Sequence, residues 1–416
     1  MKIFFSVGEP SGDQHAANLA QALRLKQQDL SLTGFGGPRM AEAGCKLLHD
    51  MSSLAVMGLG PALAKLPQFA RLLAQANRYF AQQRPDAVVL VDFPGFNWWI
   101  ARCAKRHGIP VYYYCPPQVW AWARWRVSKL RRLADHILCT LPFEAAWLNE
   151  RGCHATYVGH PYFDDVRLKQ LDREFVAAQR RLAGPMVTIL PGSRTQEIKH
   201  NLPSLLKAAA RVRAEVPQVR FCIAAFKPAH AELAGRMAQV TGLPIDIHVG
   251  RTQELMHLAT CCLAVSGSVS LELLYHTRPT AILYQLSRSG FWLYNAMLKV
   301  PYITLVNLIS TGRLERPARA AGQLASANED HVLFPEYPTC QDCSPQLAAH
   351  IVRWLTDENS HSDRVAELAE LKARLCHGGA SRKAADYLLT TLAHHSEQIP
   401  RPHFLPGAPT PGKRKM

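Results

Sequence analysis

The chain has 416 residues, of which 48% are hydrophobic and 19% are charged, a composition typical of a soluble globular protein. This length predicts two domains of about 150–200 residues each. The formal net charge of +16 favours an anionic partner: a nucleic acid, an anionic lipid or a phosphorylated substrate. No stretch resembles a secretory signal or reaches about 18 apolar residues, so we expect neither export nor a transmembrane helix.

Short apolar runs alternate with helical patterns through the first half of the chain. This alternation predicts a doubly wound parallel sheet. The runs expected to form strands lie at residues 2–7, 32–35, 88–92, 110–115, 136–140 and 155–158. Between the first strand and the first helix lies a glycine-bearing turn, in which Ser11 and Gln14 predict a capping box.

The strand at 88–92 is the most informative one, because it ends in Asp92 and is followed by a Phe93-Pro94-Gly95 turn and by Asn97. In open α/β sheets, ligands bind outside the carboxyl ends of the strands. Asp92 can therefore act as a general base toward a substrate hydroxyl. The same pattern is compatible with an aspartate that only caps the following helix.

Residues 52–73 interrupt the alternation with an apolar segment that has basic residues at its edges. Such a segment can lie on a membrane or line a pocket for acyl chains. A core helix preceded by a loop explains the pattern equally well.

A polar helix over 167–181 is expected to connect the first half to a second alternating series. Strand-like runs recur at 186–190, 219–224, 245–249, 262–265 and 280–284. The sequence thus predicts two Rossmann-like halves with a ligand cleft between them. Amphipathic helices are expected at about 345–356, 363–376 and 380–394, followed from residue 396 by a disordered proline-rich tail.

Two turns of the second half suit phosphate binding. Gly192-Ser193-Arg194 follows a strand and opens a helix, so it offers backbone N–H groups and a guanidinium. Ser266-Gly267-Ser268 repeats the arrangement, and Glu272 lies where it can accept hydrogen bonds from ribose hydroxyls. Two such turns favour a nucleoside diphosphate, although an ordinary βα turn with a surface arginine remains an alternative for the first.

Between Asp92 and Asp135 the chain has no acidic residue but many basic and aromatic ones. This mixture fits single-stranded nucleic acid, anionic lipid or a phosphorylated small molecule. No nucleic-acid-binding motif is present, so we expect no such partner. His160 follows a strand and is either structural or a substrate ligand. Cys340 and Cys343 form the only CxxC, and without further ligands at matching spacing we expect no metal site.

Nine motifs together resemble the lipid-A-disaccharide synthase family, which consists of inverting glycosyltransferases with a GT-B fold. They run in the family's order over about residues 2–340. The motifs are Gly8-Glu9-Pro10-Ser11-Gly12-Asp13, Val56-Met57-Gly58, Asp92-Phe93-Pro94-Gly95-Phe96-Asn97, Pro117-Gln118-Val119-Trp120-Ala121-Trp122, Leu141-Pro142-Phe143-Glu144, Gly159-His160-Pro161, Leu190-Pro191-Gly192-Ser193-Arg194, Ser266-Gly267-Ser268 and Asn307-Leu308. The chain departs from the usual pattern at Pro10, Gly95 and Ser268, and it lacks a glutamine near Thr339.

The resemblance implies transfer of a sugar from UDP-2,3-diacylglucosamine to 2,3-diacylglucosamine 1-phosphate, giving a β-1,6-linked lipid A disaccharide 1-phosphate and UDP. Asp92 would deprotonate the acceptor hydroxyl in a single inverting displacement, without a metal or another cofactor. The enzyme would lie on the inner face of the cytoplasmic membrane, against anionic lipid, and a homodimer is compatible with the resemblance.

The resemblance also assigns the site residues. The acceptor and lipid would contact Ser11, Gly12, Asp13, Met57, Asn97, Gln118, Trp120, Arg126, Lys129 and His160. The UDP-sugar would contact Gly192, Ser193, Arg194, Ser266, Gly267, Ser268, Glu272, Asn307 and Glu336. We expect an acceptor and membrane domain (1–165), a connector (166–184), a donor domain (185–378), a terminal helix returning to the first domain (379–395) and a disordered tail (396–416).

Two alternatives stay open on the sequence. One is a UDP-sugar epimerase or hydrolase of the same fold, and the other is a non-catalytic protein that binds anionic lipid.

Overall fold

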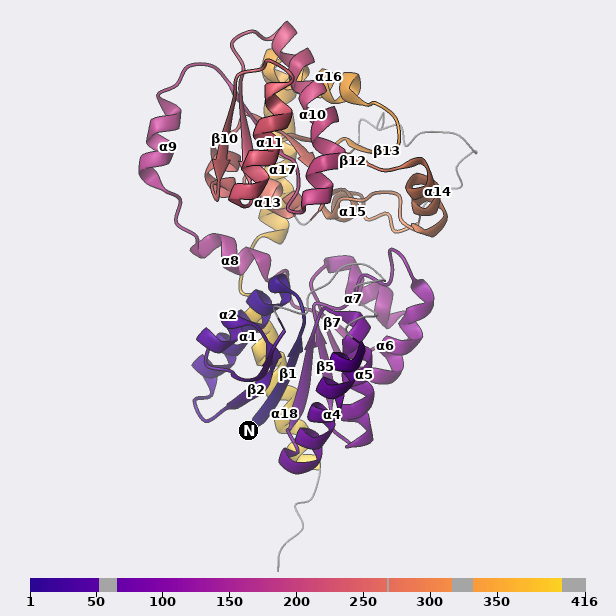
Figure 1. Cartoon of the computed structure of the whole chain (residues 1–416). Coiled ribbons are helices and arrows are strands. Elements are labelled where there is room, and N and C mark those ends of the chain that lie inside the picture. The colour runs from indigo at the N-terminus through magenta and orange to yellow at the C-terminus, as the bar shows by residue number, and fades with distance from the viewer. Residues whose placement is uncertain (52–65, 268, 316–331, 399–416) are drawn as a thin grey trace, which may run out of the picture.

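The computed structural model describes residues 1–51, 66–267, 269–315 and 332–398, which form two parallel sheets with covering helices (Figure 1). The first sheet has the order β3-β2-β1-β4-β5-β6-β7. Its strands are β1 (Lys2–Val7), β2 (Ser31–Gly36), β3 (Lys46–Asp50), β4 (Ala87–Val91), β5 (Val111–Tyr114), β6 (His136–Cys139) and β7 (Ala155–Tyr157). The associated helices are α1 (Pro10–Lys26), α2 (Pro38–Glu42), α4 (Leu66–Gln83), α5 (Pro94–Arg106), α6 (Val127–Leu133) and α7 (Pro142–Asn149), with a 3₁₀ turn at Arg124–Arg126.

The second sheet has the order β10-β9-β8-β11-β12-β13, and its paired strands are again parallel. Its strands are β8 (Met186–Leu190), β9 (Arg220–Ala225), β10 (Ile245–Val249), β11 (Cys261–Val265), β12 (Thr280–Gln285) and β13 (Glu336–Thr339). Its helices are α10 (Thr195–Glu215), α11 (Pro228–Gln239), α12 (Thr252–Leu258), α13 (Val269–Tyr275), α14 (Arg288–Met297), α15 (Leu305–Thr311), α16 (Ser344–Thr356) and α17 (Glu358–Leu375).

The first sheet is buried on both faces, which explains why its strands are continuous apolar runs rather than alternating ones. Successive residues of β4 enter different clusters: Val88 and Leu90 pack on one face, and Val89 and Val91 on the other. This follows from the two-residue period of a strand.

In each sheet the strand order reverses at one point, where successive strands begin to be added on the other side of the first strand. In the first sheet β1 lies between β2 and β4, and in the second β8 lies between β9 and β11. The loops after β1 and β4, and those after β8 and β11, therefore leave their sheets at topological switch points. Ligands of open α/β sheets bind at such points.

The chain passes between the sheets twice. It goes out through α8 (Tyr162–Leu168) and α9 (Arg173–Arg180), and it returns through α18 (Ala380–Gln398), which packs against α1. The Asp164 carboxylate accepts hydrogen bonds from the backbone N–H groups of Ala380 (3.2 Å) and Ser381 (2.8 Å). The outgoing and returning segments are thus joined at one place.

The strands at the predicted positions are present, but several details differ from the prediction. The polar helix expected over 167–181 is broken at 169–172, because Asp172 caps a new helix by accepting the Phe175 N–H (3.0 Å). The capping box of Ser11 and Gln14 is wrong: α1 begins at Pro10, with Glu9 as its N-cap and no side-chain cap. Proline is favoured at the first helical position, and the helix starts two residues earlier than predicted, at Pro10.

Strands β3 and β13 were not predicted, since one is polar and the other contains a proline. The last helix extends to Gln398, and residues 399–416 of the expected tail lie outside the described residues. Most of the predicted apolar segment 52–73 also lies outside them, and its final part begins α4. Among the described residues, no helix has the length and apolar character needed to cross a membrane.

Candidate active site

Asp92 follows β4 in a strained backbone conformation. Asp92 and Phe93 both have φ of +46°, in the left-handed region that non-glycine residues rarely adopt. The Asp92 carbonyl oxygen accepts hydrogen bonds from Asn97 Nδ2 (2.8 Å) and from the Tyr113 hydroxyl (2.8 Å). Each such residue costs about 1–3 kcal/mol and persists only when its surroundings fix it. The two hydrogen bonds provide that fixation.

Asn97 is fully buried and joins the ends of two strands. Its Nδ2 also donates to the Ser6 carbonyl (3.2 Å), and its Oδ1 accepts from Ser6 Oγ (2.7 Å). All of these partners belong to the protein. The structure therefore gives Asn97 a positioning role for Asp92, and its buried side chain has no exposed atom with which to contact an acceptor.

The turn after β1 packs directly on the turn after β4. A Cβ at Gly8 would lie 2.2 Å from the Phe93 ring, so only glycine lets the two turns approach this closely. This contact explains the glycine at position 8.

The Asp92 carboxyl group is perturbed by its surroundings. Its pKa is raised to about 6, mainly by burial and also by the negative charge of Glu9, while a hydrogen bond from the Phe93 backbone N–H opposes both. Loss of water penalises the charged form, and a second carboxylate does the same. A group with such a pKa exchanges protons readily near neutral pH, as a general base must.

The alternative assignment of Asp92 as a helix cap does not fit the structure. The N-cap of α5 is Phe93, no side-chain cap hydrogen bond is present there, and Pro94 occupies the first helical turn.

The other residues of the first loop differ in accessibility. Asp13 is buried, and its carboxylate accepts hydrogen bonds from the N–H groups of Gly37 (2.8 Å) and Arg39 (3.0 Å) at the start of α2. Gly12 is buried and Ser11 is exposed. Of these three, only Ser11 has an exposed side chain.

Residues 115–123, between β5 and the 3₁₀ turn, form a loop that we call the aromatic loop. It is anchored inside the protein. Trp120 is fully buried and donates from Nε1 to Glu144 Oε1 (3.0 Å), while burial raises the pKa of Glu144 to about 7. Gln118 and Arg126 are exposed, and Lys129 is half-buried. Trp120 thus shapes this loop from the interior, and the three other side chains remain accessible from solvent.

His160 lies beside His15, with ring centroids 6.1 Å apart, and its Nδ1 accepts the Tyr162 backbone N–H (3.2 Å). Burial, and to a lesser degree the neighbouring His15, lower the pKa of His160 to about 3. The ring is therefore neutral at physiological pH.

The first phosphate turn already holds an anion from the protein itself. Glu197 Oε2 accepts the N–H groups of Ser193 (3.0 Å) and Arg194 (3.2 Å), and Glu197 Oε1 pairs with Arg194 Nη1 (2.9 Å). Gly192 has φ of +109°, and a Cβ there would lie 2.6 Å from Glu197 Oε2. The turn is therefore wrapped around a carboxylate by the same groups that were predicted to bind phosphate.

The second phosphate turn lies beside the first one. Leu190 of β8 pairs with Ala264 of β11, so the two turns leave the same edge of the sheet. Ser266 is half-buried and Gly267 is exposed. Ser268 of this turn and Met57 of the predicted acceptor site lie outside the described residues.

Glu272 is tied to both its own half and the connector. It accepts a hydrogen bond from Gln253 Nε2, and Gln253 Nε2 lies 3.5 Å from the Tyr162 hydroxyl of α8. Burial raises the pKa of Glu272, whereas the charge of Lys169 and the hydrogen bonds lower it. Its carboxylate is held close to the outgoing connector.

Asn307 and Glu336 form a buried pair on the far side of the second sheet. Asn307 Nδ2 donates to Glu336 Oε2 (3.1 Å), which also accepts the Thr304 N–H (3.0 Å). Both side chains are at most 5% exposed, and burial raises the pKa of Glu336 to about 7. In this structure the pair fastens α15 to β13 and presents little surface to a ligand.

Sequence reasoning did not single out several residues on which the site depends. Glu9 lies in the first motif and Tyr113 lies in the strand predicted at 110–115, but neither was predicted to act on Asp92. In the structure both act on Asp92 directly. Glu197 lies three residues after Arg194, a spacing typical of a helix-start carboxylate. That spacing could have predicted from the sequence that Glu197 bonds to this turn.

Comparison with known proteins agrees with these features. The family model for lipid-A-disaccharide synthetase matches residues 3–329. Over 397 residues the chain is 33% identical to the lipid-A-disaccharide synthase of Myxococcus xanthus, and the match covers 94% of this chain and 97% of that protein.

Solved structures show the same fold at low identity. The UDP-GlcNAc 2-epimerase of Neisseria meningitidis, bound to UDP-GlcNAc, superposes with a TM-score of 0.59 and 10% identity over 95% of this chain and all of that one. A calicheamicin glycosyltransferase superposes with a TM-score of 0.56 and 13% identity over 95% and 99% of the two chains. The two Rossmann-like halves therefore form a GT-B fold.

The pKa of Asp92 predicts how turnover depends on pH. Because a base must be deprotonated, kcat/KM should fall as the pH drops below about 6 and should be constant above about 7. Glu9→Gln removes one cause of the raised pKa and should move this limb to lower pH. A pH–rate profile of both proteins checks this, and a limb that stays in place in the variant would contradict the assigned interaction.

Proposed function

Because the chain belongs to the lipid-A-disaccharide synthase family and is a glycosyltransferase of lipid A biosynthesis, we propose a specific reaction and specific roles for its residues. The donor is UDP-2,3-diacylglucosamine and the acceptor is 2,3-diacylglucosamine 1-phosphate. The products are the β-1,6-linked disaccharide 1-phosphate and UDP. The observation that carries the mechanism is the carboxylate of Asp92 at the switch point of the first sheet, with its raised pKa and its fixed backbone.

Asp92 acts as the general base. Its carboxylate takes the proton of the acceptor 6-hydroxyl as that oxygen attacks the anomeric carbon of the donor. The bond from that carbon to the UDP diphosphate breaks in the same step, so the configuration inverts. The raised pKa of Asp92 and its fixed backbone support this role, since a base works best near the operating pH and in a defined position.

The leaving UDP gains negative charge as the bond breaks. Arg194 and the backbone N–H groups of the turns at 192–194 and 266–267 are the groups that stabilise this charge. A guanidinium and preorganised N–H donors can supply such stabilisation themselves, which supports a metal-independent reaction. Glu272 binds the ribose, and Gln118, Arg126 and Lys129 are accessible candidates for the acceptor.

Epimerases share this fold, but their sequences are only 10–13% identical to this one and the likeness concerns the fold alone. The discriminating observable is therefore the dependence of UDP release on the acceptor.

The reaction is tested by measuring UDP release in detergent, with and without 2,3-diacylglucosamine 1-phosphate and without added metal. We expect release only with the acceptor, together with a new disaccharide phosphate. Release in the absence of acceptor would indicate a hydrolase or an epimerase instead. Full inhibition by a chelator, with recovery on adding a divalent cation, would contradict metal independence.

Glu197 should compete with the donor diphosphate, because its carboxylate occupies the N–H groups of Ser193 and Arg194. Glu197→Gln removes the competing charge and should lower the Kd for UDP by about threefold to tenfold, the range of one weak charge-assisted contact. Titration calorimetry with UDP measures this. Glu232→Gln, an exposed change on α11, is the control for general charge. Weaker UDP binding in Glu197→Gln would show that the carboxylate builds the turn instead.

We also propose that the enzyme is peripheral on the inner face of the cytoplasmic membrane. Trp125 is 64% exposed next to the cations of Arg126 and Lys129, and Trp292 of α14 is 73% exposed. The end of α14 adjoins the aromatic loop, since the Lys299 N–H donates to the Ala121 carbonyl (3.0 Å). Exposed tryptophans among basic side chains are typical of surfaces that bind anionic membranes.

Replacing both Trp125 and Trp292 by serine should weaken binding to phosphatidylglycerol-containing vesicles more than about tenfold, because burial of each large side chain is worth about 1.5–3 kcal/mol. Vesicle co-sedimentation measures this. Leu25→Ser, on a residue that is 87% exposed on α1, should leave binding unchanged. An equal loss of vesicle binding in the double tryptophan variant and in Leu25→Ser would contradict a membrane surface at these two tryptophans.

We propose that each sheet belongs to a domain with its own function. We propose residues 1–165 as the acceptor and membrane domain, 166–184 as the connector and 185–378 as the donor domain, with 379–395 returning to the first. UDP should then protect backbone amides from hydrogen exchange mainly within 185–378, and protection centred on 1–165 would contradict this. The family resemblance also favours a homodimer, which light scattering would reveal as about twice the chain mass of 46.3 kDa.

A further inference from the structure

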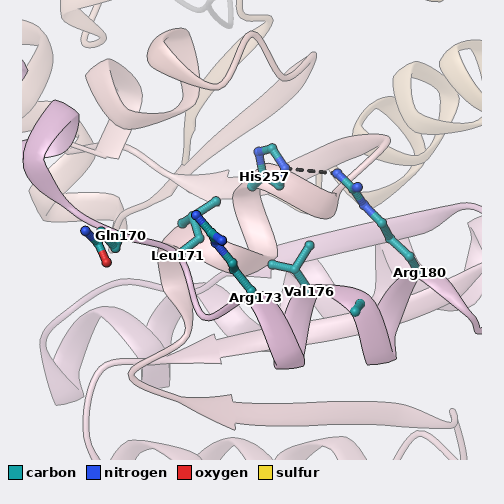
Figure 2. A pocket seen from close by; sticks show the side chains of 7 residues that line it. Gln170, Leu171, Arg173, Val176, Arg180 and His257 are labelled. Atoms are coloured by element: carbon teal, nitrogen blue, oxygen red, sulfur yellow. Dashed lines mark hydrogen bonds between the residues drawn. The ribbon is translucent and has the colours of Figure 1, made fainter.

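Two adjoining pockets lie beside the connector, away from the loops described above. One has a volume of 490 Å³ and lies between α9 and α12 (Figure 2). The other has a volume of 410 Å³ and extends to the end of α13 and to α17. Leu171 and His257 line both pockets. We call the combined space the linker groove. Volumes of this size suit a small-molecule ligand.

The linker groove is lined by cations. Figure 2 shows Arg173, Val176 and Arg180 projecting from α9 on the side of the groove, with Arg180 reaching His257. Helix residues with this spacing share one face. No aspartate or glutamate occurs among the described residues that line either pocket. The basic side chains are Arg167, Lys169, Arg173, Arg180, Arg278 and Lys372, together with His257 and His276.

The cations of the groove perturb its two histidines, whereas Lys169 acts on the carboxylates of Glu272 and Asp165. Burial lowers the pKa of His257, and the charges of Arg278 and Arg180 lower it further. The pKa of His276 falls to about 3, through burial and then through His257, Arg278 and Lys372. No carboxylate is among the causes of either of these two shifts.

Several hydrogen-bond donors in the groove have incomplete partners. Arg278 Nη2 donates to the His257 carbonyl (2.6 Å), but its buried Nε has no partner. Arg180 Nη2 lies 3.1 Å from His257 Nε2, which must accept there because arginine cannot. An arginine side chain carries five N–H donors, so both residues can donate to a further acceptor.

Part of this arrangement has a local explanation. Arg278 satisfies a carbonyl near the end of α12, and Lys372 lies 4.5 Å from the centre of the Tyr275 ring. Those contacts account for the positions of two cations. They do not account for Arg173 and Arg180 on the opposite wall, where α9 adds two more positive charges to a groove already lined by cations.

We propose that the linker groove binds a small soluble anion that carries a phosphate group. Phosphate accepts several charge-assisted hydrogen bonds at once and neutralises neighbouring guanidinium groups. A lipid headgroup offers the same chemistry, but α9 lies on the opposite side of Figure 1 from α6 and α14, which adjoin the proposed membrane surface. A soluble phosphate compound therefore fits better. This site goes beyond the proposed transfer reaction, because the groove does not include the donor turns at 192–194 and 266–267, although Gln253, which lines it, donates to Glu272.

The test uses inorganic phosphate as the probe on the full chain, at constant ionic strength set with chloride. We expect a saturable, phosphate-dependent rise in the unfolding temperature, both with and without excess UDP. The double variant Arg173→Gln, Arg180→Gln should weaken the apparent affinity by about tenfold or more, since hydrogen bonds to charged groups contribute about 1.5–3 kcal/mol. Arg211→Gln, Arg236→Gln removes two exposed charges from α10 and α11 and should behave like wild type.

Three results would overturn the proposal. A response that is absent at constant ionic strength, or equal in the two double variants, would mean that the groove has no specific site. A response that UDP abolishes would place the phosphate at the donor turns instead. Loss of binding to phosphatidylglycerol vesicles in the groove variant, without any phosphate response, would assign the groove to a lipid headgroup. Failure of UDP to bind at all would contradict the proposed function but would leave the groove measurement valid.

Discussion

The buried side chain of Asn97 is the constraint on which the catalytic half depends. It bonds to Ser6 at the end of β1 and to the Asp92 carbonyl after β4, so it fixes the point where the first sheet changes direction. Asp92 can then occupy a left-handed conformation that a free loop would leave. Its carboxylate lies near Glu9 and accepts a hydrogen bond from the Phe93 backbone N–H. A single amide thus links sheet topology to the position and the pKa of the proposed base.

The site in the second half is organised by a side-chain carboxylate instead of a buried amide. Its phosphate turns lie at the corresponding switch point, but Glu197 supplies the negative charge that the first turn is built to receive. The turn is therefore preorganised around a carboxylate, which a diphosphate bound there, as proposed, would have to displace. Preorganisation of this kind shapes the site before the ligand binds. The carboxylate already present lowers the affinity for a second anion.

The sequence predicted the strands and the switch-point residues well, because buried parallel strands are continuous apolar runs and polar residues follow directly at their ends. It could not distinguish residues that contact ligands from residues that hold the backbone. Asn97, Asp13 and Asn307 belong to the motifs, and the resemblance also assigned Glu336 to the site. The polar atoms of all four side chains are hydrogen-bonded within the protein interior. That distinction depends on burial across elements far apart in the chain. The basic linker groove was invisible for the same reason, since α9, α12 and α17 are separated by many residues.

The central claim is that Asp92 deprotonates the acceptor, and the most direct measurement compares acceptor-dependent turnover of wild type and Asp92→Asn together with the Kd for UDP. The account predicts that turnover falls by about 10²–10⁴-fold, the usual contribution of a general base, while UDP binds as before. Unchanged UDP binding also shows that the variant is folded. Turnover equal to that of wild type, with UDP bound equally well, would contradict the account.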